Sequence, residues 1–142
     1  EGQAGTEAML ARAATLGPLA FAREQAAAIW HPSYATAHPD EVERFIAWRA
    51  AMDQAALTCA FRSSYGTDLR PALSGFRMPV LVIAADADPF VRLETAHEIA
   101  ARIPGAEFAL IEPSGHMAPI EQAEAFNAAV VDFLGRTGRG TA

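Results

Sequence analysis

Hydrophobic positions divide the chain into two parts with different periodicity. Up to about residue 63 the apolar residues recur at the three- and four-residue spacing of helices, and no run is typical of a strand. Proline and glycine separate these segments, as at Gly17-Pro18, where the proline suits the first turn of the next helix. The pattern predicts helices over residues 7–16, 19–30, 39–52 and 54–62, with a break at residues 31–33.

After residue 63 the pattern alternates between strand and helix. The clearest strand is residues 80–85, an apolar run between Pro79 and Asp86 that is typical of a parallel strand buried on both faces. One or two helical turns are predicted over 68–73, a helix over 92–103, a strand over 107–111 and a last helix over 119–134, ended by Gly135. Strand, helix and strand of this length indicate the parallel crossover of a doubly wound α/β sheet.

Two strands alone do not complete such a sheet. A strand as apolar as residues 80–85 would leave an edge and part of a face uncovered if it had only one neighbour. We therefore expect the remaining strands to come from a complementary amino-terminal polypeptide or from a homo-oligomer mate.

Net charge and composition limit the classes of binding partner that the chain could have. The 142 residues include 17 acidic and 11 basic side chains, the net charge is −6, and the arginines are scattered. This balance argues against nucleic acid and anionic membranes as partners, and no apolar run approaches the roughly 18 residues of a membrane helix. A small-molecule substrate is expected. The loop after residue 85 also lacks the glycines of a nucleotide site.

The numbers of cysteines and histidines and their spacing indicate whether a disulfide or a metal site is expected and which compartment fits the chain. The single cysteine, Cys59, excludes an internal disulfide, and the four histidines lack metal-ligand spacing. No metal or other cofactor is therefore expected. A reducing compartment, the cytoplasm, fits one free thiol.

Two loops carry residues suited to catalysis. Asp86 and Asp88 follow the first strand, and His116 follows the second, and open α/β sheets place their sites at the carboxyl ends of such strands. A neutral imidazole can take the proton of a hydroxyl nucleophile, and a carboxylate on its other nitrogen fixes its tautomer. In a loop this short either aspartate could be that carboxylate. If it is Asp88, we expect Asp86 to cap the next helix.

The order of these motifs resembles the carboxy-terminal part of α/β-hydrolase fold proteins, and its spacing resembles enol-lactonase-like and esterase-like members most. The matching stretch, residues 68–134, contains Met78-Pro-Val-Leu-Val-Ile-Ala-Ala-Asp-Ala-Asp88-Pro, a helix, Ile103-Pro-Gly-Ala, a strand, Ser114-Gly-His116 and a helix that opens near Glu121. The resemblance implies that Asp88 is the triad acid and His116 the triad base. It also implies that residues 1–67 form a helical cap and residues 68–142 the carboxy-terminal part of the core.

The sequence departs from the family at the nucleophile. It contains no Gly-x-Ser-x-Gly elbow and no His-Gly oxyanion segment, and Ala85 stands where the family usually has glycine. None of the serines lies in a strand-to-helix turn flanked by small residues: Ser33, Ser63, Ser64, Ser74 and Ser114. In the family the nucleophile precedes the cap, so the resemblance places it on a missing amino-terminal half.

The predicted function is therefore the carboxy-terminal part of a serine-type hydrolase that cleaves an ester, lactone or related carbonyl substrate. Two alternatives stay open: a non-catalytic module that associates through its sheet edge, and a cofactor-free lyase, dehalogenase or oxygenase on the same fold. Met117 and Ile120 beside His116, and Trp48 in the cap, are the expected substrate contacts. Glu121 is expected to cap its helix and complement the helix dipole rather than to catalyse.

Overall fold

The computed structural model describes residues 2–65 and 68–138, which form two compact units. The first unit comprises Glu1–Ala28 and Ala35–Asp68, and the second comprises Ile29–Tyr34 and Leu69–Ala142. Most of the second unit is the continuous segment that starts at Leu69, and the assignment of a cap and a core to the two parts of the chain stays a prediction. The second unit also includes the short segment Ile29–Tyr34, which the sequence placed inside the cap.

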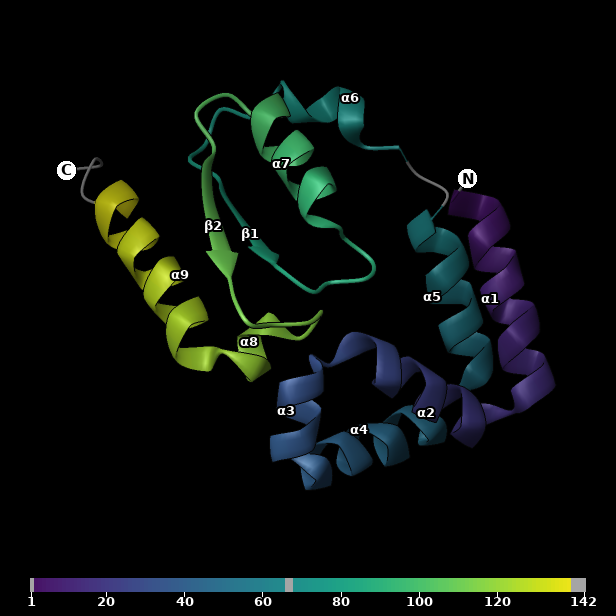
Figure 1. Cartoon of the computed structure of the whole chain (residues 1–142). Coiled ribbons are helices and arrows are strands. Elements are labelled where there is room, and N and C mark those ends of the chain that lie inside the picture. The colour runs from purple at the N-terminus through teal and green to yellow at the C-terminus, as the bar shows by residue number, and fades with distance from the viewer. Residues whose placement is uncertain (1, 66–67, 139–142) are drawn as a thin grey trace. The chain divides into compact units, whose positions relative to one another are not determined.

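The first unit is built from helices, as the spacing of its apolar residues predicted. They are α1 (Gly2–Leu16), most of α2 (Pro18–Ile29), α4 (Pro39–Ala51) and α5 (Gln54–Tyr65) (Figure 1). Phe21, Ala22 and Ile46 are buried in this unit. The buried Arg49 lies over the ring of Phe21 at 5.7 Å, a cation–π contact, and its desolvation lowers its pKa.

One helix was not predicted. The helix α3 (Pro32–Ala37) begins inside the break that was expected at residues 31–33, with the proline at its first position. The His31 side chain satisfies the start of this helix, because its Nδ1 accepts a hydrogen bond from the backbone N–H of Ser33 at 3.2 Å. The same nitrogen lies 2.7 Å from the Ser33 hydroxyl. A side-chain cap of this kind compensates for the shortness of the helix.

The second unit contains the predicted parallel sheet. Its elements are α6 (Arg70–Leu73), β1 (Leu81–Ala85), α7 (Leu93–Arg102), β2 (Glu107–Ile111), α8 (Ala118–Glu121) and α9 (Ala123–Thr137). The two strands run side by side in the same direction, with Leu81 opposite Glu107 and Ala85 opposite Ile111 (Figure 1). The predictions of two neighbouring parallel strands and a helix between them are confirmed.

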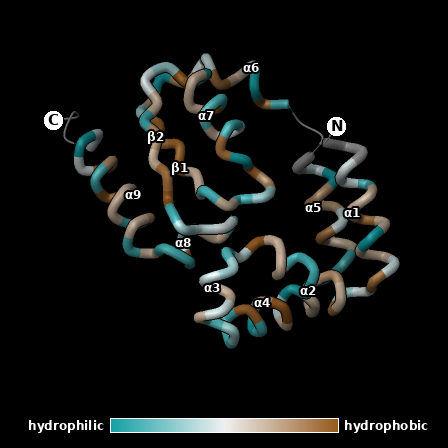
Figure 2. Tube along the Cα trace, in the orientation of Figure 1, coloured by the Kyte–Doolittle hydropathy of each residue, from teal (hydrophilic) through white to brown (hydrophobic). Residues whose placement is uncertain are grey.

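Helices cover both faces of this sheet. Successive side chains of a strand point to opposite faces, so Phe108 and Ile111 face different helices. The Phe108 ring stacks on His97 of α7 at 4.1 Å, whereas Ile111 is buried with Ala85 and Ala118, and Phe126 of α9 packs against that cluster. Figure 2 shows hydrophobic colour along both strands between these helices.

The last predicted helix is wrong in its continuity and its end. Residues 118–137 form two helices, because Gln122 leaves the helical conformation at φ −133° and ψ 54°. Its side-chain amide donates to the carbonyl of Pro113 at 2.8 Å, which holds the bend against the loop before it. Gly135 does not end α9, which continues to Thr137, since a glycine inside a helix costs only about 1 kcal/mol.

Within the described residues β1 and β2 pair only with each other, so each strand leaves one edge unpaired there. None of the helices in that part of the chain is long and apolar enough to cross a membrane.

Candidate active site

The site lies where the two strands end. Ala85 and Ile111 are opposite each other in the last register position, and the two loops that follow are bonded together. The Ala87 N–H donates to the carbonyl of Ser114 at 3.0 Å, and the Ser114 N–H donates to Oδ1 of Asp86 at 2.8 Å. These bonds hold the aspartate loop and the histidine loop at a fixed separation.

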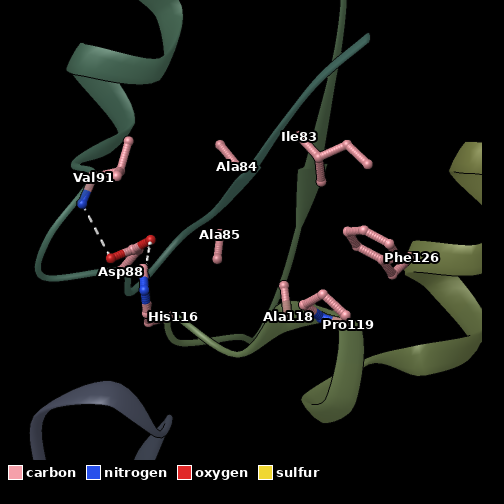
Figure 3. Close-up of a pocket in the computed structure, with 9 residues that line it drawn as sticks. All are labelled: Ile83, Ala84, Ala85, Asp88, Val91, His116, Ala118, Pro119 and Phe126. Carbon is pink, nitrogen blue, oxygen red and sulfur yellow. Dashed lines mark hydrogen bonds and ion pairs between the residues drawn. The ribbon is translucent and has the colours of Figure 1, made fainter. Parts of the chain in front are cut away.

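Asp88, not Asp86, is the carboxylate that contacts the imidazole. Its Oδ2 lies 2.9 Å from Nδ1 of His116, and its Oδ1 accepts a hydrogen bond from the backbone N–H of Val91 at 3.1 Å (Figure 3). The same oxygen accepts a second hydrogen bond from the backbone N–H of Phe90 at 2.8 Å. Asp86 points instead to the Ser114 backbone. The expectation that Asp86 caps the next helix is therefore wrong, because its side chain is used to join the two loops.

The surroundings of Asp88 keep it ionised. Burial of its side chain, which is 11% exposed, works to raise its pKa, but the hydrogen bonds from His116, Val91 and Phe90 outweigh this and lower the pKa below the ordinary value. A carboxylate held ionised can only accept a hydrogen bond. The proton of the shared bond therefore belongs to Nδ1 of His116 when the imidazole is neutral.

This arrangement leaves the other imidazole nitrogen available. With Nδ1 protonated, Nε2 carries a lone pair, and none of the residues that the structure describes hydrogen-bonds to it. The His116 side chain is 42% exposed, and its ring contacts the edge of Phe90 with centroids 4.9 Å apart. A neutral imidazole oriented in this way can act as a general base toward a hydroxyl group placed beside Nε2.

A cavity of about 180 Å³ borders this pair (Figure 3). Apart from Asp88 and His116 its lining is apolar: Ile83, Ala84, Ala85, Val91, Ala118, Pro119 and Phe126. Ligand sites for whole small molecules are commonly about 300 Å³ or more, so this cavity has room only for a small group next to the catalytic pair.

The expected substrate contacts lie at several places in the fold. Met117 is half-buried directly after His116, and Ile120 is 46% exposed on α8; neither lines the cavity. Trp48 is 60% exposed on α4 of the first unit, beside the ring of Phe45. Their roles in substrate binding stay predictions.

Sequence reasoning missed the residues that hold the histidine loop from outside it. The His116 N–H donates to the carbonyl of Ile29 at 2.7 Å, and Phe90 packs against the imidazole ring. The position of Phe90, two residues after the acid, was a weak signal for its contact with the imidazole. No local signal could reveal the hydrogen bond to Ile29, because Ile29 lies far away in sequence.

Metal binding has no candidate in the described ranges, where no three histidine, cysteine or acidic side chains gather in a way that could hold an ion.

A parallel strand–helix–strand unit with a carboxylate and a histidine bonded to each other at its carboxyl end matches the way α/β-hydrolases place the acid and the base of their triad. The profile of the family described as TAP-like protein matches residues 44–140. The chain belongs to this α/β-hydrolase family.

Individual relatives agree with this assignment. The chain is 33% identical over 94 residues to 2-hydroxy-6-oxononadienedioate/2-hydroxy-6-oxononatrienedioate hydrolase of Cupriavidus pinatubonensis, an alignment that covers 66% of this chain and 32% of the relative. The crystal structure of the enol-lactonase from Burkholderia xenovorans LB400 superposes with a TM-score of 0.84 at 27% identity, over 89% of this chain and 48% of that one.

A thermophilic esterase from Thermogutta terrifontis shares the fold, with a TM-score of 0.84 at 22% identity over 96% of this chain and 51% of the esterase. The chain thus spans about half the length of these solved structures and a third of the curated relative.

Proposed function

We propose that this chain supplies the acid and the base of a serine-type hydrolase that cleaves an ester, lactone or related carbonyl substrate. The observation that carries the proposal is the 2.9 Å contact between Asp88 and Nδ1 of His116, with Nε2 left available as a base. The nucleophile and the oxyanion donors would lie on a complementary amino-terminal polypeptide. Similarity to a dienedioate hydrolase and to an enol-lactonase supports a carbonyl substrate.

The mechanism follows from the orientation of the imidazole. As a serine oxygen attacks the substrate carbonyl carbon, its proton passes to Nε2 of His116, and the carboxylate of Asp88 stabilises the imidazolium. The imidazolium then protonates the leaving oxygen as the bond to the carbonyl carbon breaks. In the second half of the reaction the same nitrogen takes a proton from water, which attacks the acyl carbon, and the imidazolium returns that proton to the serine oxygen as its bond to the acyl group breaks.

No serine among the described residues is placed for this role. Ser114 lies two residues before His116, but it is completely buried, and its hydroxyl donates a hydrogen bond to the carbonyl of Gly115 at 3.3 Å. This is why we assign the nucleophile to the complementary polypeptide. We use the term complete hydrolase for this chain together with that polypeptide, taken from the preceding segment of the same gene or from whatever co-purifies with the chain.

We also propose the cytoplasm as the location of the complete hydrolase.

The first prediction tests the base. In the complete hydrolase, His116→Gln should lower kcat for a chromogenic ester by about 10⁴-fold, because the proton of the nucleophile then has no acceptor. The control is His97→Gln, which changes a histidine stacked on Phe108 away from the loops and should keep wild-type turnover. Undiminished turnover in His116→Gln would contradict the proposal.

A second candidate function rests on the missing elbow motif and the unpaired strand edges: a non-catalytic module that binds its partner through the sheet. A fluorophosphonate probe distinguishes the two. A complex that forms tightly but shows no labelled serine would favour the binding module, whereas labelling that depends on His116 favours the hydrolase.

A further inference from the structure

The carboxylate of Glu121 is buried at the junction between the histidine loop and the segment Ile29–Tyr34. The residue is only 7% exposed, at the end of α8. Within the part of the chain that the structure describes, no arginine or histidine forms an ion pair with it. A charged group buried without a counter-ion is costly unless hydrogen bonds replace its hydration.

Backbone amides provide that replacement. Oε2 of Glu121 accepts hydrogen bonds from the N–H of His31 at 2.9 Å and of Gly115 at 3.0 Å, and Oε1 accepts one from the N–H of Met117 at 3.0 Å. The bond to Met117 is the expected cap of α8, since Met117 is the residue before the helix. The other two bonds go beyond capping. Gly115 belongs to the histidine loop and His31 to a segment 90 residues earlier in the chain, so Oε2 of Glu121 joins the two.

The three bonds surround His116. Gly115 and Met117 are its two neighbours, so one side chain fixes the backbone on both sides of the imidazole. The His116 N–H itself is bound to the carbonyl of Ile29, in the same segment that Glu121 holds through His31. The direction of the His116 Cα–Cβ bond is therefore set by four hydrogen bonds, three of which end on one carboxylate.

Gly115 shows how closely the two segments approach. A Cβ at this position would lie 2.5 Å from the carbonyl oxygen of Ile29 and 2.7 Å from the nitrogen of His31, both of which are backbone atoms. The loop therefore has no room to shift toward the segment. Hydrogen bonds to an ionised acceptor are shorter and stronger than neutral ones, so the carboxylate holds this close contact in place.

We infer that Glu121 is a positioning residue for the general base: its ionised carboxylate sets the imidazole of His116 at hydrogen-bond distance from Asp88 by fixing the backbone on both sides of it. The inference rests on the proposed function, in which His116 is the base. Glu121 does not touch the reacting atoms and acts only through the loop.

The test is Glu121→Gln in the complete hydrolase. Glutamine keeps the size and one acceptor oxygen, so the bonds to His31 and Gly115 can form, but its NH₂ group faces the N–H of Met117 and the charge is lost. We expect kcat to fall by about 10- to 100-fold, with KM unchanged within about twofold because the substrate contacts remain. Glu124→Gln, three residues later on the exposed side of α9, is the matched control and should change neither constant.

A spectroscopic readout separates positioning from general destabilisation. In protein labelled with ¹⁵N-histidine, the Nδ1–H resonance that disappears in His116→Gln belongs to the bond with Asp88. It should shift or broaden in Glu121→Gln at a temperature where the variant is folded, and stay unchanged in Glu124→Gln. An unchanged resonance and wild-type kcat in Glu121→Gln, with His116→Gln inactive, would overturn the inference.

Two further outcomes are decisive. If Glu121→Gln does not fold, amide hydrogen exchange in the wild type decides: slow exchange at Gly115 and Met117 supports the role of Glu121, and rapid exchange at both overturns it. If His116→Gln keeps full turnover, His116 is not the base and the proposed function fails. The Nδ1–H resonance in Glu121→Gln then still shows whether Glu121 positions the imidazole.

Discussion

Asp88 and His116 illustrate how single residues could be assigned from sequence and where that assignment ended. Their positions after two successive strands predicted that they meet, and the 2.9 Å contact confirms it. Position in the loop left Asp86 and Asp88 both possible, whereas the resemblance to the family motif indicated Asp88, and the contact with His116 agrees with the motif. Asp86 joins the loops through Ser114, while Asp88 turns toward the imidazole.

The lowered pKa of Asp88 predicts a pH dependence of stability. A carboxyl group whose pKa is lower in the folded state stabilises the fold above its unfolded pKa, here the ordinary 3.8, and this contribution is lost as the pH falls through the lower folded value. Urea unfolding of the complete hydrolase between about pH 2 and 7 should therefore show a loss of stability below about pH 3.8 that is smaller in Asp88→Asn, which lacks the contribution of this one group. Parallel curves for the two proteins would contradict the shift.

Gly115 and Gly135 form a matched pair for the close contact behind His116. A methyl group at Gly115 meets backbone atoms at 2.5 Å, so Gly115→Ala should destabilise the protein by at least about 1–3 kcal/mol and lower kcat. Gly135 lies inside α9, where an added methyl group would have nothing within 4 Å, so Gly135→Ala should stabilise the protein by about 0.5–1 kcal/mol. Thermal unfolding measures both, and equal melting temperatures for the two variants would argue against the contact.

At the scale of elements, the sheet and its covering helices depend on a small apolar cluster. Ile111 ends β2 and is 4% exposed, packed with Ala85 and Ala118 at the point where the catalytic loops leave the strands. The cluster therefore supports both the strand pairing and the base of the loops. The other two buried residues of the cluster are alanines, so Ile111 is its one large buried side chain.

Ile111→Ala should cost about 2–5 kcal/mol of unfolding free energy, because it removes buried methyl groups and leaves a cavity. Val131→Ala on α9 removes a similar side chain that is 68% exposed, and it should change stability by less than about 0.5 kcal/mol. Chemical denaturation of both variants makes the comparison. A small loss at Ile111 would show that the cluster contributes less than its burial suggests.

At the scale of the whole molecule, the strands β1 and β2 have unpaired edges in the described part of the chain, and the chain spans about half the length of its structural relatives. Exposed edges of an apolar sheet promote association. We expect the isolated chain to self-associate, and the complementary amino-terminal polypeptide to convert it into a 1:1 complex. Analytical ultracentrifugation measures both states; a cooperatively unfolding, stable monomer of the isolated chain would contradict the need for a partner.

Much of the fold could be predicted because its signals are local. The apolar run at residues 80–85, the proline and glycine breaks and the helical spacing of the first part all act over a few residues. Both strands and the helices α2, α4, α6 and α7 lie within one or two residues of their predicted bounds, whereas α1 begins five residues earlier and α5 ends three residues later than predicted. Other differences depend on single hydrogen bonds between a side chain and the backbone that residue spacing does not reveal. The bend at Gln122 depends on a hydrogen bond to Pro113, and α3 begins with a cap from the neighbouring His31.

By itself, the sequence determined that a carboxylate loop and a histidine loop leave neighbouring parallel strands, because strand pattern and chain order are sufficient for that. The motif also indicated Asp88 as the partner of His116, and only the tertiary structure decided that the buried Glu121 ties the histidine loop to the segment Ile29–Tyr34. The physical reason is distance along the chain: hydrogen bonds between segments 90 residues apart depend on how the elements pack, and no local pattern of residue types encodes them.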